Sequence, residues 1–151
     1  MSTTTHPDLL VAKAQYETSF GWRVEVDSGH GRLVMRAGWD LDAVILPARL
    51  AHRALAELRF TMLEGPVVAT PGGQWLTFLT TLAATRQPTL PLELRRSKAQ
   101  AVPRGGQVVL PQTPSTRTDI RDWQWVVAPR QHRSPPPWCT VIAAARRAAR
   151  W

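Results

Sequence analysis

Asp40 and Asp42, separated by one leucine, are the residues whose spacing most directly suggests catalysis. On a strand, residues two apart point to the same face, so this pair could hold a divalent metal ion for phosphoryl transfer. Such a site usually contains a third acid, and this pair precedes the apolar run 43–46 instead of lying within it. We therefore predict solvated loop carboxylates or a local cap, with an active nucleotidyl transferase as the alternative.

The other reactive residue types lack the partners that their chemistry needs. The four histidines show no metal-ligand pattern, and no G-x-S-x-G nucleophile elbow is present. The single cysteine, Cys139, excludes an internal disulfide and a cysteine-based zinc site. The pairs Gly72-Gly73 and Gly105-Gly106 are not followed by the Gly-Lys-Ser/Thr of a P-loop. We therefore predict no catalytic residue, no metal and no cofactor.

Basic side chains are in excess and are concentrated late in the sequence. The 151 residues include 19 Lys+Arg and 11 Asp+Glu, for a net charge of +8, and 17 of the basic residues are arginine. Residues 1–100 carry a net +2 and residues 101–151 a net +6. A field of this sign attracts nucleic acid, anionic lipid or an acidic protein surface, and arginine grips phosphate through two N–H groups. Plain solubility and a GC-rich coding sequence are the alternatives.

Two of the seven tryptophans, Trp123 and Trp125, are predicted to share one face of a strand within this basic region. Flanked by arginines, they could stack against the bases of single-stranded nucleic acid, whereas packing in the core is the alternative. The candidate nucleic-acid-binding residues are therefore Arg104, Arg117, Arg121, Trp123, Trp125, Arg130, Arg133, Arg146, Arg147 and Arg150.

The periodicity of the apolar residues predicts both helices and strands. The run 43–46 is wholly apolar, which is typical of a central strand covered on both faces. Helices are expected at residues 8–20, 47–62 and 138–150, and strands at 22–26, 32–36, 43–46, 65–69, 74–79, 107–110 and 123–127.

Three segments lie outside these elements. Residues 1–7 are polar and are predicted to form a disordered tail, and residues 129–137 form a basic, proline-rich connector before the last helix. Prolines break any long helix between residues 85 and 103, where Leu90, Leu92 and Leu94 alternate like a short edge strand.

Together these elements predict one α+β domain over residues 8–151. It would contain a mixed, mostly antiparallel sheet of about six strands, with two to three helices packed on it. No apolar run approaches the roughly 18 residues that a membrane span needs, and the N-terminus has no apolar signal region. We expect a cytoplasmic protein without membrane contact.

Two stretches in the middle of the chain, taken in order, resemble a known family. The run 41–47 is followed by an amphipathic helix and then by residues 65–78, which contain a Thr-Pro-Gly-Gly turn. The segments 125–129 and 136–142 extend the similarity, which covers residues 20–145. In these features the chain resembles the bifunctional DNA primase/polymerase N-terminal (Prim-Pol-like) domain, and in particular its small, shortened members.

The resemblance implies a fold that has lost its catalytic groups here. In active members a strand carries paired acids that bind the catalytic metal, and a histidine after the Gly-Gly turn contacts nucleotide phosphates. The matching strand reads Val44-Ile45-Leu46 in this chain, and Trp75 stands near the position of the histidine. Asp42 is the nearest remaining acid, and no third acid can be placed. The resemblance therefore implies a catalytically degenerate copy.

Two functions follow from these observations. We expect a module that binds DNA or RNA through its basic C-terminal third, with an affinity that falls as salt rises. The alternative is a protein-interaction or regulatory module with no nucleic-acid role. In that case residues 129–151 would dock a partner protein or a second copy of the chain.

Overall fold

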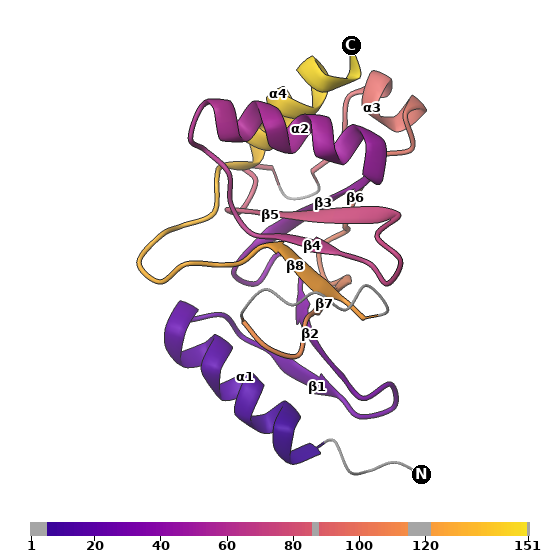
Figure 1. Ribbon diagram of the computed structural model, residues 1–151. Helices are drawn as coiled ribbons and strands as arrows, with labels where there is room; N and C mark the ends of the chain where they lie inside the picture. Colours follow the sequence, from indigo (N-terminus) through magenta and orange to yellow (C-terminus); the bar gives the residue numbers. More distant parts are fainter. Residues whose placement is uncertain (1–5, 86–87, 115–121, 151) are drawn as a thin grey trace.

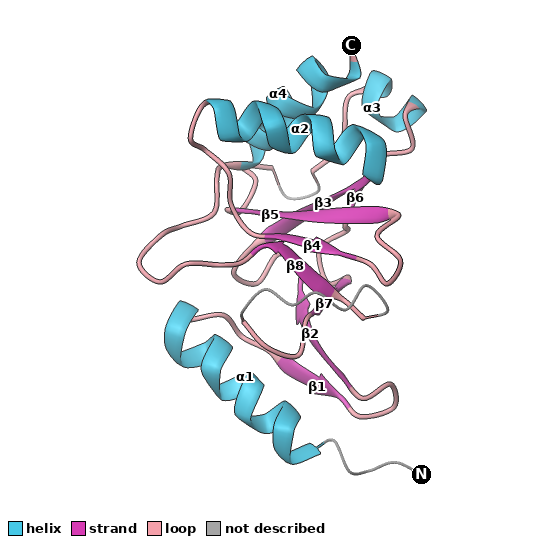
Figure 2. Ribbon diagram, viewed as in Figure 1, coloured by secondary structure: helices cyan, strands magenta, loops and turns pink. Residues whose placement is uncertain are grey.

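Two antiparallel β-sheets organise the chain in the computed structural model, which describes residues 6–85, 88–114 and 122–150. Figures 1 and 2 show three helices on one face of the larger sheet, and a fourth helix with the smaller sheet at the opposite end of the molecule. The three are α2 (Ala48–Phe60), α3 (Leu92–Arg96) and α4 (Trp138–Ala149), and the fourth is α1 (His6–Phe20).

The larger sheet positions most of the core. Its strands are ordered β6 (Gln100–Ala101), β3 (Asp42–Pro47), β5 (Trp75–Thr80), β4 (Val67–Ala69) and β8 (Gln124–Val127), and every neighbouring pair is antiparallel. Val44 and Leu46 of β3 point into the core beneath the helices, and Ala43 points into the core on the other side. The wholly apolar run is therefore a central strand with both faces covered, as the sequence predicts.

Small side chains let the helices above this sheet pack closely. Leu50, Ala51, Ala54, Leu55 and Leu58 of α2 are buried, and they share one core with Val141, Ala144, Ala145 and Ala148 of α4. A proline, Pro47 or Pro137, precedes each of these helices and has the fixed φ that suits a helix start. The apolar face of α4 is thus occupied by α2.

The end of α2 has an unusual residue at its turning point. Met62 has a positive φ of 61°, and the N–H groups of Met62 and Leu63 donate to the carbonyls of Arg59 (3.1 Å) and Leu58 (2.8 Å). This is the Schellman pattern, which usually places glycine at the positive-φ position, and a methionine there costs about 1 kcal/mol. The helix predicted over residues 47–62 therefore ends earlier, at Phe60, and Met62 is exposed.

The smaller sheet has three antiparallel strands, ordered β1 (Glu25–Asp27), β2 (Arg32–Arg36) and β7 (Gln107–Leu110). The strand predicted at residues 32–36 is confirmed as β2, whereas the strand predicted at 22–26 begins only at Glu25 and pairs with β2 as β1. Leu9 and Ala12 of α1 are buried in one cluster with Leu33 and Met35 of β2, so α1 packs against this sheet.

Tyr16 of α1 joins three parts of the chain that are far apart in sequence. Its buried hydroxyl donates to the backbone oxygen of Pro111 at 2.7 Å and accepts the indole N–H of Trp125 at 2.9 Å. The Tyr16 ring stacks on Trp22, with ring centroids 6.1 Å apart. Burial raises the pKa of Tyr16 above the ordinary tyrosine value, so the hydroxyl stays protonated and remains a donor. Thus α1, the segment after β7 and strand β8 are held together.

The predicted fold class is confirmed, while its details differ. The described residues form a single α+β domain with antiparallel strands, but the strands divide between two sheets instead of forming one. The edge strand predicted over residues 90–94 is wrong, because α3 begins at Leu92. Leu90 and Leu94 are buried, whereas Leu92 is exposed, which fits the four-residue spacing of a helical turn. Helix α1 begins at His6, within the predicted tail, and residues 1–5 lie outside the described residues.

We expect the Tyr16→Phe variant to lose about 1–3 kcal/mol of unfolding free energy, because the buried carbonyl of Pro111 loses its donor. Urea unfolding followed by tryptophan fluorescence measures this change. Phe20→Leu, at the partly exposed rim of the same aromatic cluster, is the control and should cost less. A Tyr16→Phe variant as stable as the wild type would contradict the role given to the hydroxyl.

Candidate nucleic-acid interface

Asp40 and Asp42 are held by different partners and form no shared site. Asp42 is buried, and its Oδ2 accepts hydrogen bonds from the backbone N–H of Ala83 (2.7 Å) and from Nη2 of Arg104 (3.0 Å). Asp40 lies nearer the surface, where its Oδ2 accepts the backbone N–H of Arg23 at 2.9 Å. The prediction of a solvated carboxylate is therefore wrong for Asp42. Within the described residues, no group of three or more His, Cys, Asp or Glu could hold a metal ion.

Arg104, predicted to contact nucleic acid, is instead a structural residue. Besides its ion pair with Asp42, it donates from Nη2 to the backbone oxygen of Ala83 at 2.9 Å. Its aliphatic part crosses Gly38, where an added Cβ would lie 2.7 Å from Cγ of Arg104. Gly38 also has a φ of 90°, so both the space and the backbone require glycine there. Arg104 thus connects the loop at Ala83 to Asp42 of β3.

We expect Arg104→Met to lower the unfolding free energy by about 3–5 kcal/mol, because it leaves the buried carboxylate of Asp42 without a compensating charge. Oδ1 of that carboxylate already has no hydrogen-bond partner in the described part of the chain. Arg23→Met removes the exposed partner of Asp40 and should cost about 1 kcal/mol or less. Thermal and urea unfolding of both variants measure the difference, and equal losses would contradict it.

The two candidate tryptophans have different environments. Trp125 is only 1% exposed, and its indole N–H is bound to Tyr16, so it is a core residue and the stacking prediction is wrong for it. Trp123 precedes β8 and is half-buried. Both side chains pack on the same core cluster between the two sheets, so the face that they share points toward the core and not toward solvent.

Trp123 lines a cleft of about 270 Å³, together with residues of both sheets. Ile45 of β3 and Trp75 of β5 line the same cleft, as does the hydroxyl-bearing Thr77, which is the register partner of Ile45. None of the described side chains that line it carries a charge. Of the positions that the family resemblance relates to the lost acids and histidine, Ile45 and Trp75 line this cleft, whereas Val44 and Leu46 point into the core beneath the helices. The cleft itself is lined by apolar and neutral polar groups.

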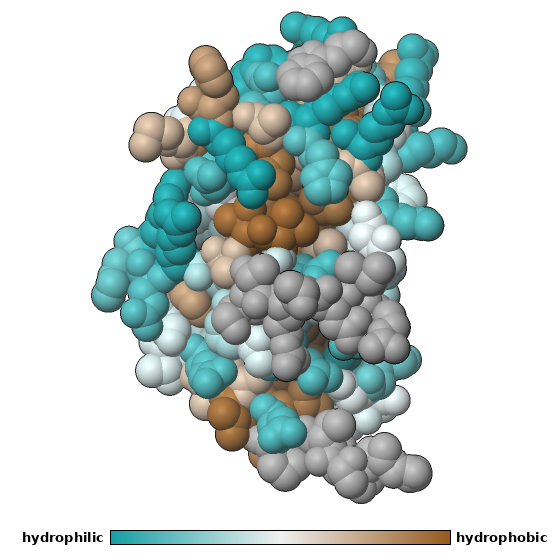
Figure 3. All heavy atoms as spheres, in the orientation of Figure 1, coloured by the Kyte–Doolittle hydropathy of each residue, from teal (hydrophilic) through white to brown (hydrophobic). Residues whose placement is uncertain are grey.

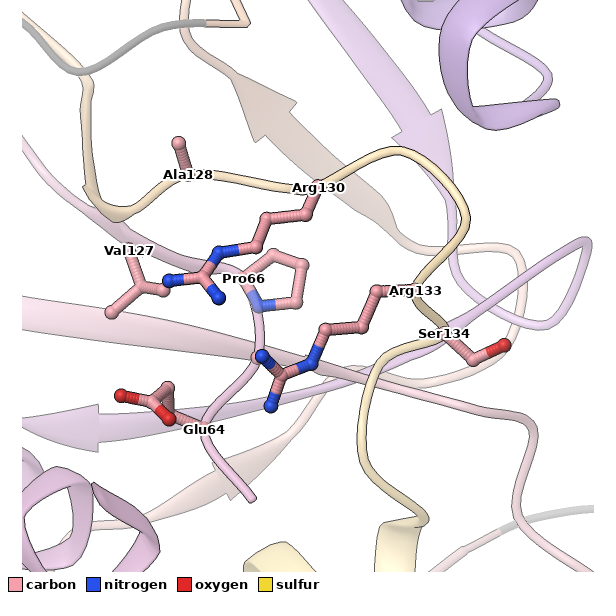
Figure 4. Close-up of a pocket in the computed structure, with 8 residues that line it drawn as sticks. Glu64, Pro66, Val127, Ala128, Arg130, Arg133 and Ser134 are labelled. Carbon is pink, nitrogen blue, oxygen red and sulfur yellow. The ribbon is translucent and has the colours of Figure 1, made fainter. Parts of the chain in front are cut away.

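The remaining arginines of the predicted site do not form one surface of the C-terminal third. Arg146 pairs with Glu93 of α3, and Arg147 pairs with Glu57 of α2 at 2.8 Å. Arg150 is exposed at the end of α4. Arg117 and Arg121 lie outside the described residues, and Arg130 and Arg133 lie in the connector, near the small pocket of Figure 4.

The positive charge gathers on the helix layer, which we define as residues 48–60, 92–98 and 138–150. These residues include nine Arg+Lys and two Glu, whereas residues 6–40 include four Arg+Lys and five Asp+Glu. Figure 3 shows hydrophilic side chains over most of the helix-bearing end. The basic residues of the helix layer that the sequence analysis left out are Arg49, Arg53, Arg59, Arg95, Arg96 and Lys98.

Ion pairing makes the contrast between the two ends sharper. At the α1 end, Lys13 pairs with Glu17, and three arginines pair with carboxylates. In the helix layer Arg95, Arg96 and Arg150 are exposed, and within the described residues none of the three has a carboxylate partner. These basic residues are visible on the polar faces of the predicted helices. The sequence analysis summed charge along the chain, and the helix layer is found only when charge is summed over the helices that pack together.

The connector carries a second, smaller basic site. Figure 4 shows Arg130 and Arg133 extending from it in the same direction, beside Pro66 and toward the side where Glu64 lies. Nη2 of Arg133 donates to the backbone oxygen of Met62 at 3.1 Å. The connector is therefore fastened to the end of α2 and is separate from the exposed arginines of α3 and α4.

Comparison of the chain with protein-family models, with curated proteins and with solved structures gives no match. Among the described residues, no helix combines the length and the apolar character that crossing a membrane requires.

Proposed function

We propose that the protein binds DNA or RNA through the helix layer, as a catalytically degenerate Prim-Pol-like domain. The observation that supports this most directly is the excess of nine basic over two acidic residues on that layer. Exposed guanidinium groups bind phosphate oxygens and release condensed counterions, which makes binding strong at low salt and independent of sequence. A cytoplasmic location, where the chain would meet nucleic acid, is part of the proposal.

The ion pairs of the helix layer are compatible with this role. Arg146–Glu93 and Arg147–Glu57 are surface pairs, with both partners partly exposed. Such pairs contribute little to stability, about 0–1 kcal/mol, so a phosphate can replace the carboxylate at small cost. At Arg95, Arg96 and Arg150 a phosphate has no carboxylate of the described residues to replace, and we propose that these three arginines make the first contacts with the nucleic-acid backbone.

Two observations support a binding module over an enzyme. Ile45 and Trp75, which stand at or near the positions of the catalytic acids and the histidine in the resembled family, line a neutral cleft. Asp42 cannot replace the acids, because it is buried and Arg104 already binds it. We therefore expect no metal-dependent primer synthesis.

We expect the double variant Arg95→Gln/Arg96→Gln to bind labelled DNA roughly ten to thirty times more weakly at about 50 mM salt, because two phosphate contacts are lost. The slope of log affinity against log salt should fall by up to about 1.8 for duplex DNA. Fluorescence anisotropy between about 50 and 200 mM salt, with single- and double-stranded DNA, measures both quantities.

Arg23→Gln/Arg32→Gln is the matched control, since it removes the same charge from the α1 end. It should keep the wild-type affinity and slope. Equal weakening in the two double variants would show that only net charge matters, and wild-type protein that fails to bind at low salt would refute the proposal.

A further inference from the structure

Three large apolar side chains lie in water at the end of α2. Phe60 is 89% exposed, Met62 78% and Leu63 44%. Figure 3 shows apolar side chains projecting at the upper left, where Figure 1 places the loop after α2. We call residues 60–63 the α2 tip. Single exposed apolar residues are ordinary on protein surfaces, but three within four residues form a patch that needs an explanation.

The backbone of the tip has a fixed shape. The two Schellman hydrogen bonds of Met62 and Leu63 close the end of the helix, and the hydroxyl of Thr61 donates to the carbonyl of Leu58 at 3.1 Å. Arg133 of the connector also donates to the backbone oxygen of Met62, at 3.1 Å. The side chains of the tip are therefore presented by an ordered turn that is held on both sides.

Met62 has no stabilising role that accounts for its identity. Its φ of 61° belongs to the region that glycine adopts without strain, and glycine is the usual residue at this position of a helix ending. Its side chain is mostly in water, so it gains little from packing. The folded chain itself gains nothing from an apolar side chain at a position where glycine would be more stable, and a contact from outside the chain gives that side chain a role.

The charges beside the tip are mainly positive. Arg59 precedes it, Arg133 of the connector binds its backbone, and Arg130 lines the pocket next to the tip together with Glu64 and Arg133. Glu64 is the acid that follows the tip, and Arg59 lies 3.7 Å from it. A complementary surface would therefore present an apolar pocket with carboxylates along its edge.

We propose that the α2 tip docks a protein partner that offers an apolar pocket edged by aspartate or glutamate. A fixed turn favours a shaped protein pocket over a lipid surface. A turn that is ordered before binding lowers the entropy cost of fitting a pocket of matching shape, whereas insertion among lipid tails requires no matching shape. This inference goes beyond the proposed nucleic-acid role. It shares Arg59 and Phe60 with the helix layer but none of the arginines given the first phosphate contacts, so either proposal can fail without the other.

Photo-cross-linking of the full chain identifies the partner. A Phe60→p-benzoylphenylalanine variant is produced in the cells that normally make the protein, irradiated, and its adduct identified by mass spectrometry. The partner is then purified, and its affinity for the wild-type chain is measured by calorimetry. We expect binding that weakens as salt rises, and a partner surface rich in aspartate or glutamate.

Met62→Gly is the decisive variant, because it removes the side chain and relieves the backbone. We expect its melting temperature to stay the same or rise while the affinity for the partner falls at least tenfold, and Phe60→Ser to lose a similar factor. Leu92→Ala, which truncates another exposed apolar side chain in the helix layer, is the matched control and should bind normally.

Four results would overturn the proposal. One is the absence of any adduct at Phe60, and a second is a purified partner that binds Met62→Gly and the wild type equally. A third is tip-dependent binding to phosphatidylglycerol vesicles, which would assign the tip to a membrane. The fourth is tip-dependent self-association in light scattering, which would assign it to a second copy of the chain.

Discussion

The buried hydroxyl of Tyr16 is the contact on which the arrangement of the two sheets depends. It connects α1, the segment that leaves β7, and Trp125 of β8 in the larger sheet. Around it the rings of Phe20, Trp22 and Trp125 fill the space between the smaller sheet, α1 and the larger sheet. With this junction closed, the helices are left on the free face of the larger sheet. The outward orientation of the helix layer is thus a consequence of contacts made on the opposite face.

The α1 end and the helix-layer end of the molecule also differ in charge. At the α1 end, carboxylates and basic groups occur in similar numbers and are mostly paired. At the helix end, small apolar side chains fill the interior between α2 and α4, and arginines cover the outside. The molecule therefore carries an electric dipole along its long axis, which would orient it during the approach to a polyanion.

Sequence patterns were sufficient where local periodicity decides the structure. The central strand β3, strand β2 and helix α2 follow from apolar spacing alone. Helix α3 was missed although Pro91, an acidic first turn and a basic last turn are ordinary helix signals, because the three leucines also fit a period of two. The ambiguity of short apolar segments explains this error.

The environments of the candidate site residues depend on long-range contacts, which a local sequence pattern does not reveal. Asp42 pairs with Arg104, 62 residues later, and Trp125 bonds to Tyr16 across 109 residues. The basic surface combines helices from the middle and the end of the chain, so counting charge by thirds of the sequence could not find it.

The junction at Tyr16 also affects how the chain folds during synthesis. Tyr16 of α1 is made 109 residues before Trp125, its partner in the edge strand β8, and α4 follows β8. Until then the edge of β4 has no partner strand, and the apolar face of α2 lacks its contacts with α4. Long-range contacts of this kind slow folding, and exposed strand edges promote aggregation. The nascent chain would therefore present a chaperone-binding surface until β8 and α4 have been made.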